Sequence, residues 1–198
     1  MTELLLQRAA ALADAGGRHL LGLAGEPGAG KTTLAEELVA ALDGRAAYVP
    51  MDGFHLAQAE LVRLGRADRK GAPDTFDVGG YTSLLRRLRT GDEPVVWAPA
   101  FDRRLEEPIA GSIAVPAQIP LVITEGNYLL HWDAVRSLLD EAWFVELDSE
   151  VRLARLEARH RAHGRDAAAA REWARGTDER NAALIRATAD RADHRVRL

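Results

Sequence analysis

The sequence contains no cysteine, so it offers neither a disulfide bond nor a thiolate for catalysis or metal binding. It also lacks an apolar run of about 20 residues, the length that a membrane-spanning helix requires. Residues 2–8 are typical of an amphipathic helix rather than of a signal peptide. These features predict a cytoplasmic protein that has no membrane partner.

Excess positive charge is absent as well, because 30 Asp and Glu residues outnumber 26 Lys and Arg residues, for a net charge of −4. Such a chain has no bulk attraction to nucleic acid, which is therefore not an expected partner. His55, His160 and His163 lack the spacing of a metal site. At 198 residues the chain predicts a single domain, residues 1–198.

The segment 25–32, Gly-Glu-Pro-Gly-Ala-Gly-Lys-Thr, matches the phosphate-loop pattern G-x-x-x-x-G-K-[ST] in full. An apolar stretch typical of a buried strand precedes it, and apolar residues recur on one helical face after it. In such a loop, backbone N–H groups surround a polyphosphate, the lysine contacts the β- and γ-phosphates, and the hydroxyl residue faces Mg²⁺. A purely structural glycine turn is the alternative. The predicted nucleotide-binding residues are Gly25, Glu26, Pro27, Gly28, Ala29, Gly30, Lys31, Thr32 and Thr33.

Apolar, β-rich stretches alternate with helical ones, which predicts an α/β fold whose central parallel sheet is flanked by helices on both faces. Helices are expected at 31–42, after Phe54, and between a cap at Asp77 and a stop at Gly91. Residues 94–120 interrupt the alternation and predict a β excursion, with short extended pieces on either side of 102–111. The expected strands are 20–24, 46–51, 95–98, 121–124 and 142–147.

A carboxylate, Asp52, follows the second expected strand. Open α/β sheets assemble their sites at the carboxyl ends of strands, so Asp52 is the candidate base that takes the proton of an attacking hydroxyl. The neighbouring Gly53 is expected to leave room for the substrate. An ordinary turn aspartate before a glycine is the alternative.

A second carboxylate, Glu125, ends the apolar stretch 121–124 in the manner of a Walker B element. We expect Glu125 and Thr32 to hold Mg²⁺, with Asp52 emerging at the same edge as a further metal candidate. A carboxylate that caps a following helix is the alternative.

Arginines gather in the helical run that begins near Ser149. Arg159 and Arg165 flank Gly164, where a lid can fold over a bound nucleotide, so they join Asp52 and Lys31 as catalytic candidates. The lid is expected at about residues 152–176. A solvated face, on which arginines pair with neighbouring glutamates, is the alternative. The four arginines of this run are Arg152, Arg155, Arg159 and Arg165.

Four segments together resemble the phosphoribulokinase, uridine kinase and pantothenate kinase family of P-loop kinases: 25–33, 50–56, 69–77 and 123–128. Within it, the chain looks most like small bacterial proteins called uridine kinase-like or fructose-transport kinase. The resemblance implies a three-layer P-loop NTPase sandwich with a helical lid, and the use of ATP and Mg²⁺. It also implies Asp52 as base, Glu125 as the residue that assists Mg²⁺, and a lid arginine that contacts phosphate.

The acceptor of the phosphoryl group is less defined by the resemblance. Gly71 stands where uridine kinases carry an aspartate that binds ribose hydroxyls, and 99–104 departs from the nucleoside-kinase pattern. Lys70-Gly71 looks more like pantothenate kinase. Nucleoside, pantothenate, sugar and glycerate acceptors all stay open. The candidate acceptor contacts are Phe54, His55, Lys70, Phe101, Asp102, Arg103 and Tyr128.

The leading hypothesis is an ATP-dependent phosphotransferase that moves the γ-phosphoryl group to an alcohol group of a small metabolite. A regulatory P-loop NTPase that acts on a protein partner is the alternative, although no guanine-reading Asn-Lys-x-Asp occurs. Adenine is expected near Ala192-Asp193. The choice between ATP and GTP and the oligomeric state, with a homodimer as one alternative, stay open.

Overall fold

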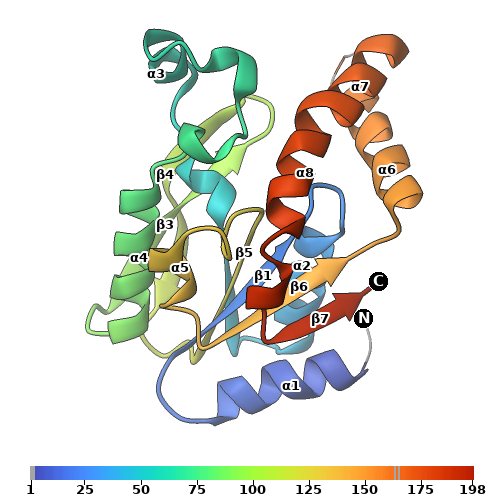
Figure 1. Ribbon diagram of the computed structural model, residues 1–198. Helices are drawn as coiled ribbons and strands as arrows, with labels where there is room; N and C mark the ends of the chain where they lie inside the picture. Colours follow the sequence, from blue (N-terminus) through green and yellow to red (C-terminus); the bar gives the residue numbers. More distant parts are fainter. Residues whose placement is uncertain (1–2, 163, 165) are drawn as a thin grey trace.

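The computed structural model describes residues 3–162, 164 and 166–198 (Figure 1). Its centre is a five-stranded sheet in the order β2-β5-β1-β6-β7, in which every neighbouring pair is parallel. The strands β3 and β4 form a separate antiparallel hairpin. The strands are β1 His19–Gly25, β2 Ala46–Pro50, β3 Val95–Asp102, β4 Glu107–Pro116, β5 Leu121–Gly126, β6 Glu141–Glu146 and β7 His194–Arg197.

Helices cover both faces of the sheet. Successive side chains of β1 point to opposite faces, and each face has its own apolar core. Leu20 belongs to the core that includes Leu85 of α4, and Leu21 belongs to the core that includes Leu38 of α2. This confirms the predicted three-layer arrangement. The α-helices are α1 Glu3–Asp14, α2 Lys31–Ala41, α3 Gln58–Arg63, α4 Val78–Thr90, α5 Asp133–Arg136, α6 Ser149–Ala162, α7 Ala167–Trp173 and α8 Glu179–Arg186. Short 3-10 turns span Met51–Phe54, Ala67–Arg69, Pro73–Thr75 and Ala189–Arg191, and a π-helical turn spans Ala174–Asp178.

The helix α4 begins and ends where the sequence predicts. The Asp77 carboxylate accepts a hydrogen bond of 2.8 Å from the Gly80 amide, which satisfies a donor of the first turn. Gly91 ends the helix in the left-handed conformation, with a φ of 66°. None of the helices in the described part of the chain is long and apolar enough to cross a bilayer.

The hairpin is longer than the predicted extended pieces. β3 continues to Asp102 and β4 begins at Glu107, so the connection shrinks to residues 103–106. The hairpin packs on the 3-10 turn at Gly53, where an added Cβ would lie 2.4 Å from the Pro99 carbonyl oxygen. Gly53 therefore makes room for the hairpin backbone, and the prediction that it makes room for substrate is wrong.

The strand β7 was not predicted, because its residues are mostly charged and Val196 is the buried one. Asp193 lies just before it, where its carboxylate accepts hydrogen bonds from Arg136 and from the Ala142 amide. This is the amino end of β6 and β7, whereas the phosphate loop leaves the carboxyl end of β1. The expectation of adenine near Ala192-Asp193 is therefore wrong.

Candidate active site

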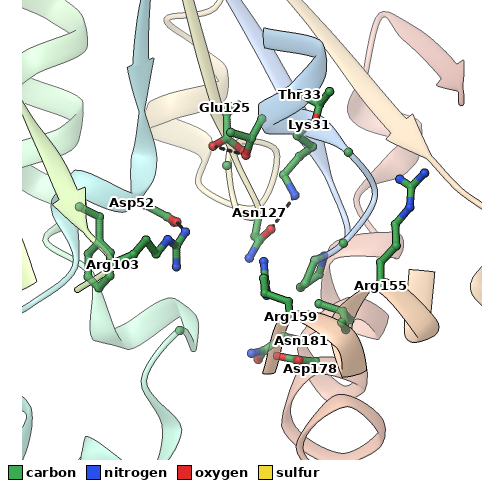
Figure 2. Close-up of a pocket in the computed structure, with 18 of the residues that line it drawn as sticks. Lys31, Thr33, Asp52, Arg103, Glu125, Asn127, Arg155, Arg159, Asp178 and Asn181 are labelled. Carbon is green, nitrogen blue, oxygen red and sulfur yellow. Dashed lines mark hydrogen bonds and ion pairs between the residues drawn. The ribbon is translucent and has the colours of Figure 1, made fainter. Parts of the chain in front are cut away.

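The parallel strands β1, β2 and β5 bring three predicted segments to one edge of the sheet. In the register of the sheet, Glu125 pairs with Leu23 of β1 and with Pro50 of β2. The phosphate loop and Asp52 follow directly, and a cleft of about 1070 Å³ opens there (Figure 2). The connection between β3 and β4 forms one wall of the cleft, and the opposite wall comes from residues 149–186, which we term the α6–α8 segment.

The phosphate loop has the backbone geometry that its glycines permit. Gly28 and Gly30 have φ values of 82° and 96°, in the left-handed region that favours glycine. Gly30 is also the N-terminal cap of α2, so the first backbone N–H groups of this helix face the cleft. A helix N-terminus with free N–H groups suits an anion such as a phosphate.

Not every residue of the loop lines the cleft. Pro27, Gly28, Gly30, Lys31, Thr32 and Thr33 do, whereas Gly25, Glu26 and Ala29 lie outside its lining. The Ala29 side chain is buried in the core below the loop. Glu26 forms ion pairs with Arg152 and Arg186 instead, at 2.9 and 2.7 Å. Glu26 thus joins the loop to the α6–α8 segment rather than facing a nucleotide.

Lys31 is buried at the base of the cleft. Its Nζ donates hydrogen bonds to the carbonyl oxygens of Gly25 and Glu26, at 2.9 and 3.0 Å, and to Asn127 Oδ1 at 2.8 Å. Burial lowers the pKa of this ammonium group, and the carboxylates of Glu125 and Asp52 oppose that shift. These three hydrogen bonds therefore fix the ammonium group beside the phosphate loop, where nucleotide phosphates would lie.

Glu125 is also buried, with its Oε1 accepting hydrogen bonds from the hydroxyls of Tyr48 at 2.8 Å and of Thr32 at 3.3 Å. Burial raises the pKa of this carboxyl group, the charge of Asp52 adds to the effect, and Lys31 opposes it. A cation bound here would favour the ionised carboxylate. The hydroxyl of Thr32 and the carboxylate of Glu125 are oxygen donors of the kind that Mg²⁺ prefers.

The protein side chains alone do not complete a metal site. Among the described residues, no group of three or more His, Cys, Asp or Glu side chains gathers as a metal centre would require. Mg²⁺ is commonly bound by one or two carboxylates together with water and substrate phosphates. The donor set at Thr32 and Glu125 therefore fits a metal that arrives with a nucleotide.

Asp52 lies in the 3-10 turn after β2, with its carboxylate about a quarter exposed, at 26%. Arg103, from the connection between β3 and β4, donates a hydrogen bond of 2.6 Å to Asp52 Oδ2. The backbone oxygen of Asp52 also lies 2.8 Å from His55 Nδ1. Arg103 thus orients the Asp52 carboxylate, and Asp52 lines the cleft.

The structure divides the predicted acceptor contacts into two groups. His55, Lys70, Phe101 and Arg103 line the cleft. Phe54, Asp102 and Tyr128 do not, so the prediction that they contact the acceptor directly is not supported. Phe54 packs on Tyr81, Asp102 accepts hydrogen bonds from the amides of the hairpin turn, and the buried Tyr128 donates to the Gly71 carbonyl oxygen.

The arginines of the α6–α8 segment have different environments. Arg155 and Arg159 line the cleft, and Figure 2 shows Arg155 on the side away from Asp52. Arg152, whose side chain is 1% exposed, points away and forms ion pairs with Glu26 and Glu179. Arg165 lies outside the described residues.

Several polar residues in the cleft were not among the predicted site residues. Asn127 lies two positions after Glu125 and is the side-chain partner of Lys31. His160 and Asp178 join α6 to the π-helical turn through a contact of 2.7 Å between Nε2 and Oδ2, and Asn181 lies beside them. The position of Asn127 at the end of a strand was an available signal. The other three become neighbours only through tertiary packing.

Replacing Arg152 by methionine tests the link between the phosphate loop and the α6–α8 segment. The substitution retains much of the side-chain volume but leaves Glu26 and Glu179 without this cation, so we expect a loss of about 3 kcal/mol in the free energy of unfolding. Urea denaturation measures it. The matched control is Arg175→Met, an exposed arginine 3.5 Å from Glu157, for which a loss below about 1 kcal/mol is expected. Equal small losses in both variants would contradict the structural role of Arg152.

The fold and the site define a nucleotide-using kinase that acts on a small molecule, as the comparisons with known proteins show. Residues 20–197 match the model of the Phosphoribulokinase / Uridine kinase family, and the chain belongs to this family. The ATP-dependent kinase-like protein notR' of Aspergillus versicolor is 38% identical over 145 residues, which cover 67% of this chain and 84% of that protein.

Solved structures agree with this assignment. A candidate fructose transport system kinase from Silicibacter sp. TM1040 superposes with a TM-score of 0.87 and 37% identity, over 98% of both chains. YFH7 from Saccharomyces cerevisiae, a P-loop protein with a circular permutation, superposes with a TM-score of 0.88, over 100% of this chain and 98% of that one. Its identity of 20% supports the fold alone.

Proposed function

We propose that this protein transfers the γ-phosphoryl group of Mg-ATP to an alcohol group of a small metabolite. The observation that carries the proposal is the meeting of Lys31, Asp52 and Glu125 in one cleft with the phosphate loop. These side chains come from three different parts of the chain and supply a cation, a candidate base and a metal-binding oxygen. A regulatory NTPase would have no evident use for Asp52 in this position.

The nucleotide phosphates would be held by the backbone N–H groups at the start of α2 and by the ammonium group of Lys31. Arg159 lines the same cleft and is the described arginine that we assign to the transferring phosphoryl group. Thr32 and Glu125 would hold Mg²⁺. When bound, this ion neutralises part of the negative charge on the phosphates.

Asp52 would act as the general base. Its carboxylate takes the proton of the acceptor hydroxyl while the hydroxyl oxygen forms a bond to the γ-phosphorus. The bond from that phosphorus to the oxygen bridging to the β-phosphorus breaks, and ADP leaves with the electron pair. Arg103 orients the Asp52 carboxylate through the hydrogen bond of 2.6 Å.

Within the α6–α8 segment, about residues 152–176 would act as the lid of a single kinase domain. The nucleoside would lie on the side of the cleft that contains Arg155, beyond the phosphate loop and away from Asp52. A side chain at Gly30 would come within 3.1 Å of Leu198 and 3.6 Å of Arg155, so glycine preserves space there. Arg165 stays a predicted catalytic residue of the lid.

An ADP-release assay tests the proposed function. The protein is incubated with Mg-ATP and, one at a time, with nucleosides, pantothenate, ketohexoses, glycerate and ribulose 5-phosphate. We expect ADP release that depends on an acceptor and that stops when EDTA removes Mg²⁺. If none of these acceptors changed the rate of ADP release, the result would contradict the proposal and favour a regulatory NTPase.

A further inference from the structure

Three cationic side chains line the cleft that contains Asp52. They are Lys70, Arg103 and Arg104, and we term the side of the cleft that they share with Asp52 the acceptor subsite. Lys70 Nζ lies 5.3 Å from the centroid of the Phe101 ring, and Arg103 Cζ lies 5.1 Å from the same centroid. Both cations therefore lie within the distance of a cation–π contact with one aromatic ring.

The carboxylates of the acceptor subsite do not match these cations. Asp52 pairs with Arg103, and the carboxylate of Glu106 lines the same side of the cleft. Asp102, outside the lining, acts electrostatically on Arg104. Lys70 Nζ donates to the backbone oxygen of Glu106, which carries no formal charge. Within the described residues, neither Lys70 nor Arg104 has an ion pair with a carboxylate. Among the residues that line the subsite, three cationic side chains thus accompany two carboxylates before any substrate enters.

Proton transfer to Asp52 would increase this imbalance. A base that accepts the hydroxyl proton becomes neutral, and Arg103 then loses the negative charge of its partner. Of the two carboxylates that line the subsite, only that of Glu106 would then still carry a charge beside the three cations. A negative charge on the acceptor would balance them at the moment when the base cannot.

His55 adds no charge to the acceptor subsite under ordinary conditions. Its ring packs between Phe76 and Phe101, with centroid distances of 4.1 and 4.9 Å. Burial lowers the pKa of this imidazole, and the charges of Lys70 and Arg103 lower it further, against Asp52. A neutral His55 beside an aromatic ring gives the subsite a flat apolar wall, so the cations supply its polarity.

We infer that the acceptor is a small alcohol that carries an anionic group, a carboxylate or a phosphate ester, bound by Lys70, Arg103 and Arg104. This rests on the proposed function, since it names the class of substrate for the same site. Arg103 hydrogen-bonds Asp52 and also faces the subsite, so the anionic group and the reacting hydroxyl are held by neighbouring groups. A compact acceptor satisfies both, and a neutral nucleoside or free ketohexose leaves the cations unpaired.

Matched pairs of acceptors that differ in charge test the inference. Glycerate is compared with glycerol, pantothenate with panthenol, and ribulose 5-phosphate with ribulose, each by kcat/KM in the ADP-release assay. We expect the anionic member of the accepted pair to be preferred at least about 100-fold, because charge-assisted hydrogen bonds to three cations are lost with the neutral member. Glycerate or pantothenate activity would identify a carboxylate, and ribulose 5-phosphate activity would identify a phosphate ester.

Variants of the acceptor subsite provide a second measurement. Arg104→Gln and Lys70→Gln should each raise the KM of the anionic acceptor at least about 10-fold, with little change in the KM of ATP. Arg103 is left intact because it also orients Asp52. The matched control is Arg63→Gln, an exposed arginine of α3 that pairs with Glu60, and it should behave as the wild type.

The outcomes separate this inference from the proposed function. Equal kcat/KM for the neutral and anionic members of an accepted pair would overturn the anionic acceptor but leave the kinase in place. An unchanged acceptor KM in both Gln variants would also overturn the anionic acceptor without contradicting kinase activity. ADP release that no acceptor stimulates would overturn the proposed function and, with it, this inference.

Discussion

Asp52→Asn is expected to lower kcat by about 10²- to 10⁴-fold, the range that a positioned general base contributes. The amide has nearly the same shape and can still accept a hydrogen bond from Arg103, but it cannot take the proton of the acceptor hydroxyl. The KM of ATP should change little, because the hydrogen bonds of the phosphate loop and Lys31 do not involve the Asp52 side chain. Steady-state ADP release with the accepted substrate measures both constants.

The control for this variant is Asp92→Asn, an exposed aspartate between α4 and β3 at the other edge of the sheet. It should retain wild-type kinetics. A thermal melt of each variant excludes loss of folded protein as the cause of low turnover. If Asp52→Asn turned over at the wild-type rate, Asp52 would not be the base, and its pair with Arg103 would have a structural purpose only.

Local sequence predicts which segments form the central strands, whereas it does not predict the edge strand β7. The buried strands β1, β5 and β6 have apolar runs that pattern alone identifies. β7 has four residues, of which Val196 is buried, and it becomes a strand because β6 offers unpaired backbone groups beside it. Such a strand is defined by its neighbour rather than by its own composition.

The candidate site shows the same division between local and tertiary information. Lys31 was predicted from the phosphate-loop pattern. Asp52 and Glu125 were predicted because they lie at the carboxyl ends of strands, which parallel strands bring together. The arginines of α6 were predicted as one face, but periodicity does not distinguish Arg152, which is buried against Glu26, from Arg159, which lines the cleft. That difference depends on the position of the phosphate loop relative to the helix.

The acceptor side of the cleft was the least predictable part. Phe54 and Tyr128 belong to segments typical of the family, yet aromatic packing and a hydrogen bond to Gly71 account for their positions. Arg104 was not singled out, because an exposed arginine in a turn has no distinguishing pattern. Its meaning comes from lining the same cleft as Lys70, a residue that lies more than 30 positions earlier and hydrogen-bonds Glu106 of the same hairpin turn.

Lys31→Met is expected to lower kcat/KM for ATP by at least about 100-fold, the scale for removing one preorganised donor from a developing negative charge. The ammonium group is buried and bonded to Asn127 and to two carbonyl oxygens of the loop, so its position is fixed before a nucleotide binds. Both affinity and rate should decrease, because the phosphates carry negative charge in the ground state and in the transition state. Isothermal titration calorimetry with ATP and steady-state kinetics measure the two effects separately.

Lys31→Arg should lower kcat/KM for ATP almost as much as Lys31→Met does. Because arginine keeps the positive charge, this result would show that the shape of the cation matters as well as its charge. The enclosed site around Lys31 suits a compact ammonium group, and a planar guanidinium needs more space and a different arrangement of acceptors. The chain uses 26 Lys and Arg residues, yet one of its two lysines occupies this position, which agrees with a requirement for size. Arg63→Met on the surface of α3 is the control for loss of a remote cation and should bind ATP as the wild type does. Wild-type ATP affinity in Lys31→Met would contradict the assignment of residues 25–32 as the phosphate-binding loop, because no other described lysine lies at its base.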